Sequence, residues 1–196
     1  MKKLAIFASG NGSNAQNVIE HFKDSETARV TLVISNKNNA YVLERATALG
    51  VPSVVIPREQ LTTENPAELL ALLQEQGTDY IILAGYLLKI PAILTETYKA
   101  KIINIHPALL PKFGGKGMYG KHVHQAVIDA AETQSGITIH LVDSNYDSGS
   151  TLFQASCPVF PNDTAESLAE RIHTLEKEHF AKEIEKYISQ TYKEER

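Results

Sequence analysis

The stretch LAIFASGNGSNA (residues 4–15) decides the fold of this chain. Its five apolar residues are typical of a buried strand, its two glycines let the backbone approach a ligand, and a helix is expected to follow. The free N–H groups at the start of that helix favour an anion such as a phosphate. A tight turn that binds no ligand is an equally good interpretation of a lone glycine loop.

The same stretch fits the relaxed dinucleotide-binding pattern Gly10-x-Gly12-x-x-Ala15. That pattern requires an acidic residue about twenty positions further on, to bind the ribose hydroxyls. The chain has Ile34-Ser35-Asn36-Lys37 there, and no Gly-Lys-Ser/Thr follows the loop as a P-loop would require. We therefore expect no nicotinamide cofactor, while a phosphate remains compatible with the loop.

Beyond residues 4–15, short apolar runs alternate along the chain with stretches whose apolar residues have helical spacing. This alternation predicts a parallel α/β sheet. The expected strands are 4–8, 30–34, 53–56, 80–83 and 102–105, and the expected helices are 15–22, 40–49, 66–75 and 91–98. Gly50 and Gly77 are expected to end two of the helices.

Beyond His106 the pattern changes. The glycine-rich segment GGKGMYG (114–120) leads into a short helix, two strands over 136–142 and 151–159, and a long helix capped by Asp163 or Thr164. The turn-rich link 143–150 is too short for a helical crossover, so we expect these strands to pair antiparallel. The charged end, 193–196, is expected to fray.

These elements predict one Rossmann-like α/β domain over residues 1–196. Its sheet would be mainly parallel, become mixed in the C-terminal half, and carry helices on both faces.

Composition excludes several classes of protein. The 19 Lys+Arg and 23 Asp+Glu give a formal charge of −4, without the excess of positive charge that nucleic-acid binding favours. The lone Cys157 excludes a disulfide scaffold and favours a reducing compartment. No apolar run is long enough for a membrane span or a signal peptide. We therefore predict a cytoplasmic protein that binds neither nucleic acid nor membranes.

Asn104 and His106 lie at the end of the fifth expected strand. Two residues apart, they point to the same side, and the carboxyl ends of parallel strands are where open α/β sheets bind ligands. An amide beside an imidazole suits chemistry on a carbonyl group, although a His-Pro pair at a strand end is more often structural. Asp147, in the turn between the last two strands, either caps its own turn or orients and charges an imidazole.

The other polar positions give weaker signals. His122 and His124 face different sides of a helix, and no HExxH motif or cysteine pair is present, so we predict no metal site. His140 either reaches the site from its strand or is an ordinary hydrogen-bonded histidine of the sheet. His173 and Glu176, on the last helix, are expected at the surface by default.

Five motifs occur in an order that identifies a family. They are SGNGSN (9–14), LAGY (83–86), NIHPALLPK (104–112), HVHQA (122–126) and DSG (147–149). Together they resemble the folate-dependent formyltransferases and, within these, the phosphoribosylglycinamide formyltransferases. The likeness covers residues 4 to about 180.

The resemblance implies transfer of a formyl group from 10-formyltetrahydrofolate to the amine of 5-phosphoribosylglycinamide, in de novo purine (IMP) biosynthesis, through a tetrahedral intermediate. It implies that Asn104, His106 and Asp147 are catalytic. It implies that phosphate and ribose bind at Gly12, Ser13, Asn14 and Glu176, and folate at Leu87, Leu88, Lys89, Ile90, Asn104 and His140. Residues about 1–100 would then form the phosphate-binding half, and about 101–190 the catalytic and folate-closing half, of a monomer or homodimer that acts on small molecules.

The chain departs from the family pattern in several places. The segment 113–121 is longer than in the commonest family form, and we expect a mobile lid there. Leu87-Leu88 stand where many relatives have Met-Arg. Thr62 or Thr63 stands where an arginine is expected, with Arg58 nearby, and His173 stands where others often have glutamine.

Three alternatives are considered. A 10-formyltetrahydrofolate hydrolase would share the three catalytic residues but carries a regulatory domain before the first strand, which begins here at Leu4. The related methionyl-tRNA formyltransferase needs a basic C-terminal domain, which a chain of net negative charge disfavours. A non-catalytic nucleotide-binding module would use the glycine loop alone, and would leave Asn104, His106 and Asp147 far apart.

Overall fold

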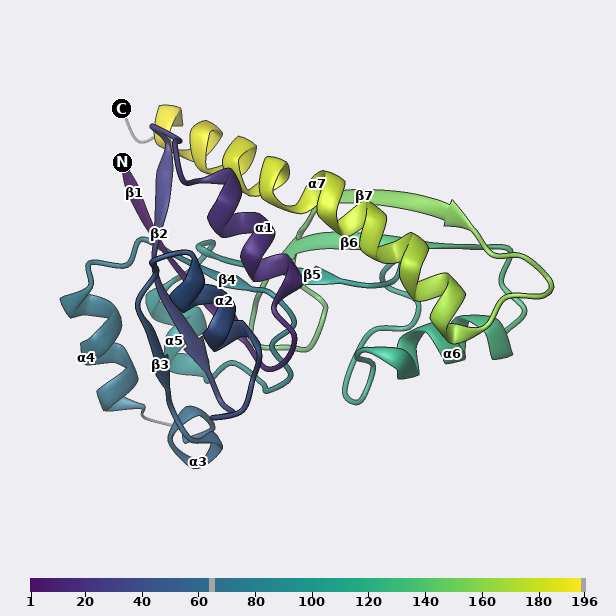
Figure 1. The fold of residues 1–196 in the computed structure, drawn as a ribbon, viewed down its shortest axis with the longest axis horizontal. Coiled ribbons are helices and arrows are strands. Elements are labelled where there is room, and N and C mark those ends of the chain that lie inside the picture. Colours follow the sequence, from purple (N-terminus) through teal and green to yellow (C-terminus); the bar gives the residue numbers. More distant parts are fainter. Residues whose placement is uncertain (64–65, 195–196) are drawn as a thin grey trace.

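Seven strands form one mixed sheet in the computed structural model, which describes residues 1–63 and 66–194 (Figure 1). The spatial order is β3-β2-β1-β4-β5-β6-β7. The pairings among the first five strands are parallel, and the β5–β6 and β6–β7 pairings are antiparallel. The strands are β1 (Lys2–Ala8), β2 (Ala28–Ser35), β3 (Ser53–Val55), β4 (Tyr80–Leu83), β5 (Ile102–His106), β6 (Gln134–Leu141) and β7 (Thr151–Pro158). The predicted mainly parallel sheet with an antiparallel C-terminal part is confirmed.

The sheet has a topological switch between β1 and β4, because the chain leaves β1 towards β2 and β3 and then returns to its other side. Ligands of open α/β sheets bind outside the carboxyl ends of the strands at such a switch. The glycine loop after β1 therefore lies at the expected edge.

Helices cover both faces because successive residues of the central strands point to opposite sides and both sides are apolar. In β1, Leu4, Ile6 and Ala8 pack into one buried cluster, and Ala5 and Phe7 into the other. The first cluster includes α1 (Ser13–His21), α2 (Val42–Ala48), α6 (Lys121–Asp129) and α7 (Ala165–Glu194), and the second includes α3 (Arg58–Leu61), α4 (Ala67–Glu75) and α5 (Ala92–Thr97). Among these described helices, none combines the length and apolar character that crossing a membrane requires.

Several element boundaries differ from the prediction. β1 begins at Lys2, which pairs with Ala28, because main-chain hydrogen bonds extend a strand beyond its apolar residues. Helix α3 was not predicted, since four residues are too few to show a helical period. Gly50 and Gly77 follow α2 and α4 with positive φ, as helix-ending glycines do, so that prediction is confirmed.

Helix α7 connects the first part of the chain with the antiparallel end of the sheet: it runs along α1 and over β6 and β7 (Figure 1). Thr164 caps its start, accepting a hydrogen bond from the Ser167 amide at 3.2 Å, and Ser167 Oγ accepts one from the Thr164 amide at 3.0 Å. The frayed end predicted from residue 193 is helical through Glu194, and the last two residues lie outside the described part of the chain.

Candidate active site

The glycine loop opens α1 without a side-chain cap, so the first amide groups of the helix are free to bind an anion. Gly12 has a left-handed backbone conformation (φ 80°). A Cβ atom at this position would lie 2.5 Å from the side chain of Val42, so both the dihedral angle and the space require glycine. The glycine loop is therefore held by the packing of α2 against the start of α1.

Glu176 of α7 lies beside this loop, and its carboxylate accepts a hydrogen bond from Asn14 Nδ2 at 3.0 Å. Its side chain is buried, which corrects the default expectation of a surface residue. Burial raises the pKa of the Glu176 carboxyl, although the hydrogen bond from Asn14 acts in the opposite direction. We call the glycine loop, Asn14 and Glu176 the glycine-loop end of the site.

At the other end, Asn104 of β5 lies directly opposite His140 of β6. Asn104 Nδ2 is 3.1 Å from His140 Nε2, and His140 Nδ1 is 2.8 Å from the carbonyl oxygen of Leu141. A carbonyl only accepts, so Nδ1 carries the proton and neutral Nε2 accepts from Asn104. Burial lowers the pKa of His140, which agrees with a neutral ring. His140 lines the cleft and is also fully hydrogen-bonded within the sheet, so the structure shows both features that the sequence left open.

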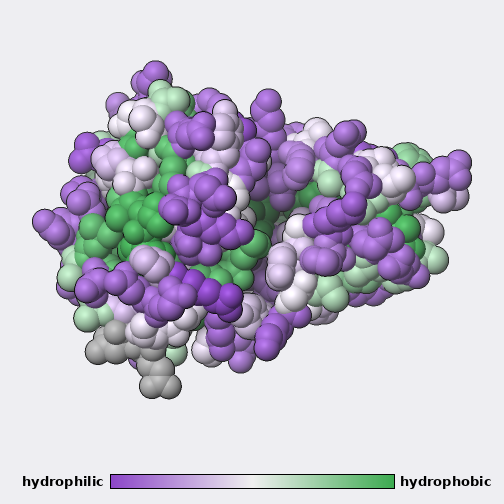
Figure 2. Space-filling model, turned by 60° about the horizontal axis from the view of Figure 1, so that its bottom comes forward, coloured by the Kyte–Doolittle hydropathy of each residue, from purple (hydrophilic) through white to green (hydrophobic). Residues whose placement is uncertain are grey.

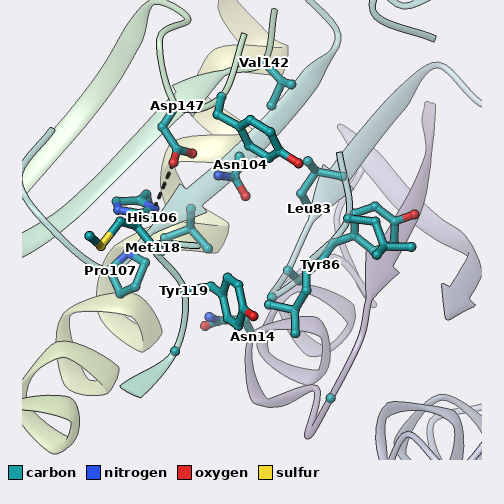
Figure 3. A pocket seen from close by; sticks show the side chains of 18 of the residues that line it. Asn14, Leu83, Tyr86, Asn104, His106, Pro107, Met118, Tyr119, Val142 and Asp147 are labelled. Atoms are coloured by element: carbon teal, nitrogen blue, oxygen red, sulfur yellow. Dashed lines mark ion pairs between the residues drawn. The ribbon is translucent and has the colours of Figure 1, made fainter. Parts of the chain in front are cut away.

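His106 is held from both sides. Its Nε2 donates to the carbonyl oxygen of Phe113 at 2.8 Å, and its Nδ1 faces Asp147 Oδ2 at 3.7 Å, the ion pair marked in Figure 3. The second oxygen of Asp147 is 3.7 Å from His140 Nε2, so this carboxylate lies between two imidazoles. We call Asn104, His106, His140 and Asp147 the imidazole end of the site.

Asp147 reaches this position because the turn between β6 and β7 folds back sharply onto the sheet. At Gly149 an added Cβ atom would lie 1.8 Å from the carbonyl oxygen of Leu141, so only glycine permits the approach. Asp147 itself has a positive φ of 51°, and its Oδ2 accepts a hydrogen bond from the Gly115 amide at 2.8 Å. The aspartate is thus fixed by another loop as well as by its own turn.

One cleft of about 900 Å³ contains both ends. All the site residues expected from the sequence line it, including the segment Leu87, Leu88, Lys89 and Ile90. The glycine-rich segment lines it too, and Figure 3 shows Met118 beside His106 and Pro107, with Tyr119 near Asn14. Whether this segment moves as a lid stays a prediction.

The rim of the cleft is partly apolar: Leu87, Tyr119 and Tyr146 are exposed there, and the Lys89 ammonium lies 5.7 Å from the Tyr146 ring. On the side shown in Figure 2, hydrophobic residues gather on the wider part of the molecule, while the narrower part shows hydrophilic and hydrophobic residues together. The position where the family pattern has an arginine is occupied here by Thr62 or Thr63. Arg58 of α3 nevertheless lines the cleft.

Two further histidines of the cleft, His124 and His173, were not among the site residues expected from the sequence, although His124 lies in a family motif and His173 stands where relatives often have glutamine. The spacing of residues along each helix could have indicated that both histidines face the cleft. His124 is three residues from Val127, which is buried on the same face of α6. His173 is three residues from Glu176 on α7. Among the described residues, no group of three or more histidine, cysteine or acidic side chains is arranged to hold a metal ion.

Comparisons with known proteins agree on one family. Residues 2–184 match the family model described as formyl transferase. The chain is 44% identical to a chloroplastic phosphoribosylglycinamide formyltransferase of Arabidopsis thaliana over 182 residues, which are 91% of this chain and 62% of that protein. It is 36% identical to a phosphoribosylglycinamide formyltransferase of Haemophilus influenzae, over 90% of this chain and 82% of that protein. The chain thus spans less than two thirds of the length of the plant relatives.

Solved structures give the same result. A phosphoribosylglycinamide formyltransferase from Streptococcus pneumoniae superposes with a TM-score of 0.83 at 38% identity, covering 94% of this chain and 97% of that one. One from Bacillus halodurans has a TM-score of 0.88 at 32% identity and covers 97% of both chains.

Proposed function

The chain belongs to the formyl transferase family, and on this premise we propose that it transfers the formyl group of 10-formyltetrahydrofolate to the amine of 5-phosphoribosylglycinamide. The reaction would be a step of de novo purine biosynthesis. The observation that carries the proposal is the single cleft in which an anion-binding helix start faces an amide, an imidazole and a carboxylate. The names of the relatives supply the identity of the acceptor.

The ribonucleotide would lie along the cleft from the glycine-loop end to the imidazole end. Its phosphate would accept hydrogen bonds from the free amides at Ser13 and Asn14, where the helix dipole also favours negative charge. The buried carboxylate of Glu176 would accept from the ribose hydroxyls, in an orientation fixed by Asn14.

The folate would occupy the other side of the cleft. The pterin ring has donors and acceptors that suit main-chain groups, and the segment 87–90 offers these next to apolar side chains. The amide of Leu87 donates to Ser9 Oγ at 3.1 Å, which ties this segment to the end of β1. The turn carrying Tyr146 and Asp147 would close over the ring, and Asn104 and His140 would border the formyl group.

In the chemical step the substrate amine attacks the formyl carbon, and the carbonyl oxygen becomes an oxyanion. Asn104 has one amide N–H left after its bond to His140, and it would donate to that oxygen. Protonated His106 would stabilise the same charge through Nδ1–H, because its Nε2–H is already bound to Phe113. Collapse then breaks the bond from the formyl carbon to N10 of the folate. Asp147, directly or through water, would take the proton lost by the amine and return one to N10.

The experiment that tests this function measures formyl transfer from 10-formyltetrahydrofolate with and without phosphoribosylglycinamide. We expect turnover to require the ribonucleotide and to collapse in His106→Ala and Asp147→Asn. Formate release without the ribonucleotide would replace the proposal with the hydrolase. Binding of the ribonucleotide without any turnover would replace it with the non-catalytic module, against which the 3.1 and 3.7 Å distances within the imidazole end already count.

We further propose that both substrates are small molecules handled by a cytoplasmic monomer or homodimer. Light scattering after gel filtration would give the mass in solution, and a value above twice the chain mass of 21.6 kDa would contradict this.

A further inference from the structure

The wall between the two ends of the cleft contains a histidine to which no role has been assigned. His124 lies on α6, lines the cleft and is only 4% exposed. Its Nδ1 atom is fully enclosed, yet no described group forms a hydrogen bond with it. A buried nitrogen without a partner costs free energy, and therefore calls for an explanation.

The protonation state of His124 follows from its surroundings. Burial, with smaller contributions from His173 and His106, lowers the pKa of His124 to about 4, so the ring is neutral at physiological pH. A neutral ring has one N–H, and enclosing a bare nitrogen costs less than enclosing an N–H without an acceptor. The proton is therefore on Nε2. This atom is not among the enclosed ones and no described residue binds it, so His124 presents an unused donor.

The position of this donor is given by its neighbours. His124 is close enough to both His173 and His106 for their charges to affect it. His173 in turn acts on Glu176, which binds Asn14. His124 thus lies between the glycine-loop end and the imidazole end. A ligand with its phosphate at one end and its reacting amine at the other must pass this wall.

We propose that His124 is a substrate-binding residue whose Nε2–H donates to an uncharged oxygen of the ribonucleotide, in the sugar–amide segment between its phosphate and its amine. The inference rests on the proposed function, which supplies the ligand. A neutral donor suits a neutral oxygen, whereas the helix start serves the charged phosphate. The unpaired Nδ1 is the structural cost of aiming Nε2–H into the cleft.

The test compares three variants by steady-state kinetics, varying each substrate separately. His124→Leu, of similar volume without a donor, should raise KM for phosphoribosylglycinamide about tenfold, the loss expected for one hydrogen bond in a buried site. KM for the folate and kcat should stay within about twofold. His124→Gln, whose amide N–H lies near the position of Nε2, should recover most of the affinity. His122→Leu is the matched control, because that histidine is exposed on the same helix.

Thermal unfolding separates binding from a structural role. Since His124→Leu removes the unpaired nitrogen, its Tm should equal or exceed that of the wild type. A lowered Tm with an unchanged KM for the ribonucleotide would overturn the inference, and so would equal KM values for His124→Leu and His122→Leu.

The failure of the inference can be distinguished from that of the proposed function. If the wild type transfers formyl to the ribonucleotide but His124→Leu binds it normally, as followed by calorimetry without folate, only the inference is wrong. If the wild type neither binds nor formylates the ribonucleotide, both are wrong.

Discussion

The two ends of the cleft are built differently. The glycine-loop end rests on regular elements: Gly12 packs against α2, and Asn14 binds α7. The imidazole end depends on two loops that hold each other, because Phe113 binds His106 and Gly115 binds Asp147. Phe113 and Asp147 both have positive φ, a backbone strain that helix and strand residues avoid. The binding end is thus coupled to folding, and the chemical end to the arrangement of its loops.

The largest expected effect is at the imidazole end. His106→Ala should lower kcat about 100-fold, or about 3 kcal/mol of transition-state stabilisation, because the oxyanion loses a charged donor. The midpoint of urea unfolding should change little. His21→Ala is a suitable control for kcat, since His21 lies at the end of α1 away from the glycine loop and does not line the cleft. A variant that unfolds at much lower urea would show that the chemical end is also coupled to folding.

The second effect is at the glycine-loop end. Gly12→Ala should lower the free energy of unfolding by about 1–3 kcal/mol, because the new Cβ atom meets Val42 in a strained conformation. KM for the ribonucleotide should rise with it. Gly10→Ala places its Cβ in open space and should leave the free energy of unfolding near that of the wild type. Equal unfolding curves for both variants would contradict the coupling proposed for this end.

The third effect is a pH dependence of the free energy of unfolding, and it arises from His124, which lies between the two ends of the cleft. As pH falls below 6.5, unfolded His124 takes up a proton, whereas the folded residue, with its pKa of about 4, does not. The contribution of neutral His124 to the free energy of unfolding is therefore complete above pH 6.5 and is lost as the pH falls towards 4. By pH 5.5 the free energy of unfolding should have fallen by about 1 kcal/mol. Urea titrations at pH 7.5 and 5.5 should show a smaller difference for His124→Leu than for the wild type. The raised pKa of Glu176 has the opposite sign and is common to both proteins.

The smallest effect tests the contact between the two loops. Gly115→Ala strains a residue with φ 99° and should disturb the amide that binds Asp147, lowering kcat about fivefold. Gly117→Ala strains a residue with φ 89° to a similar degree but does not touch Asp147, so it should lower kcat by less than Gly115→Ala does. Equal losses in kcat would mean that the Gly115 contact does not position Asp147.

Each end was predictable to a different degree. At the glycine-loop end, a strand, two glycines and a helix start lie within twelve consecutive residues, so local rules offered an anion site and a tight turn without a ligand as equal interpretations. At the imidazole end, the spacing of Asn104 and His106 predicted a common side. For Asp147, forty-one residues after His106, the residues left two interpretations open, a turn cap or a partner of an imidazole, and the family resemblance favoured the second. Hydrophobic periodicity describes one element at a time and does not say which turn lies over which strand.

The sequence by itself determined the alternation of strands and helices, the antiparallel end of the sheet, and the glycines that close α2 and α4, because these depend on local backbone preferences. Only the tertiary structure decided that Glu176 is buried beside Asn14, 162 residues away, and that His124 rather than His122 faces the cleft. Those outcomes depend on α7 lying across α1 and α6. The packing of distant elements, rather than any local pattern, determines which polar side chains leave water and what they meet there.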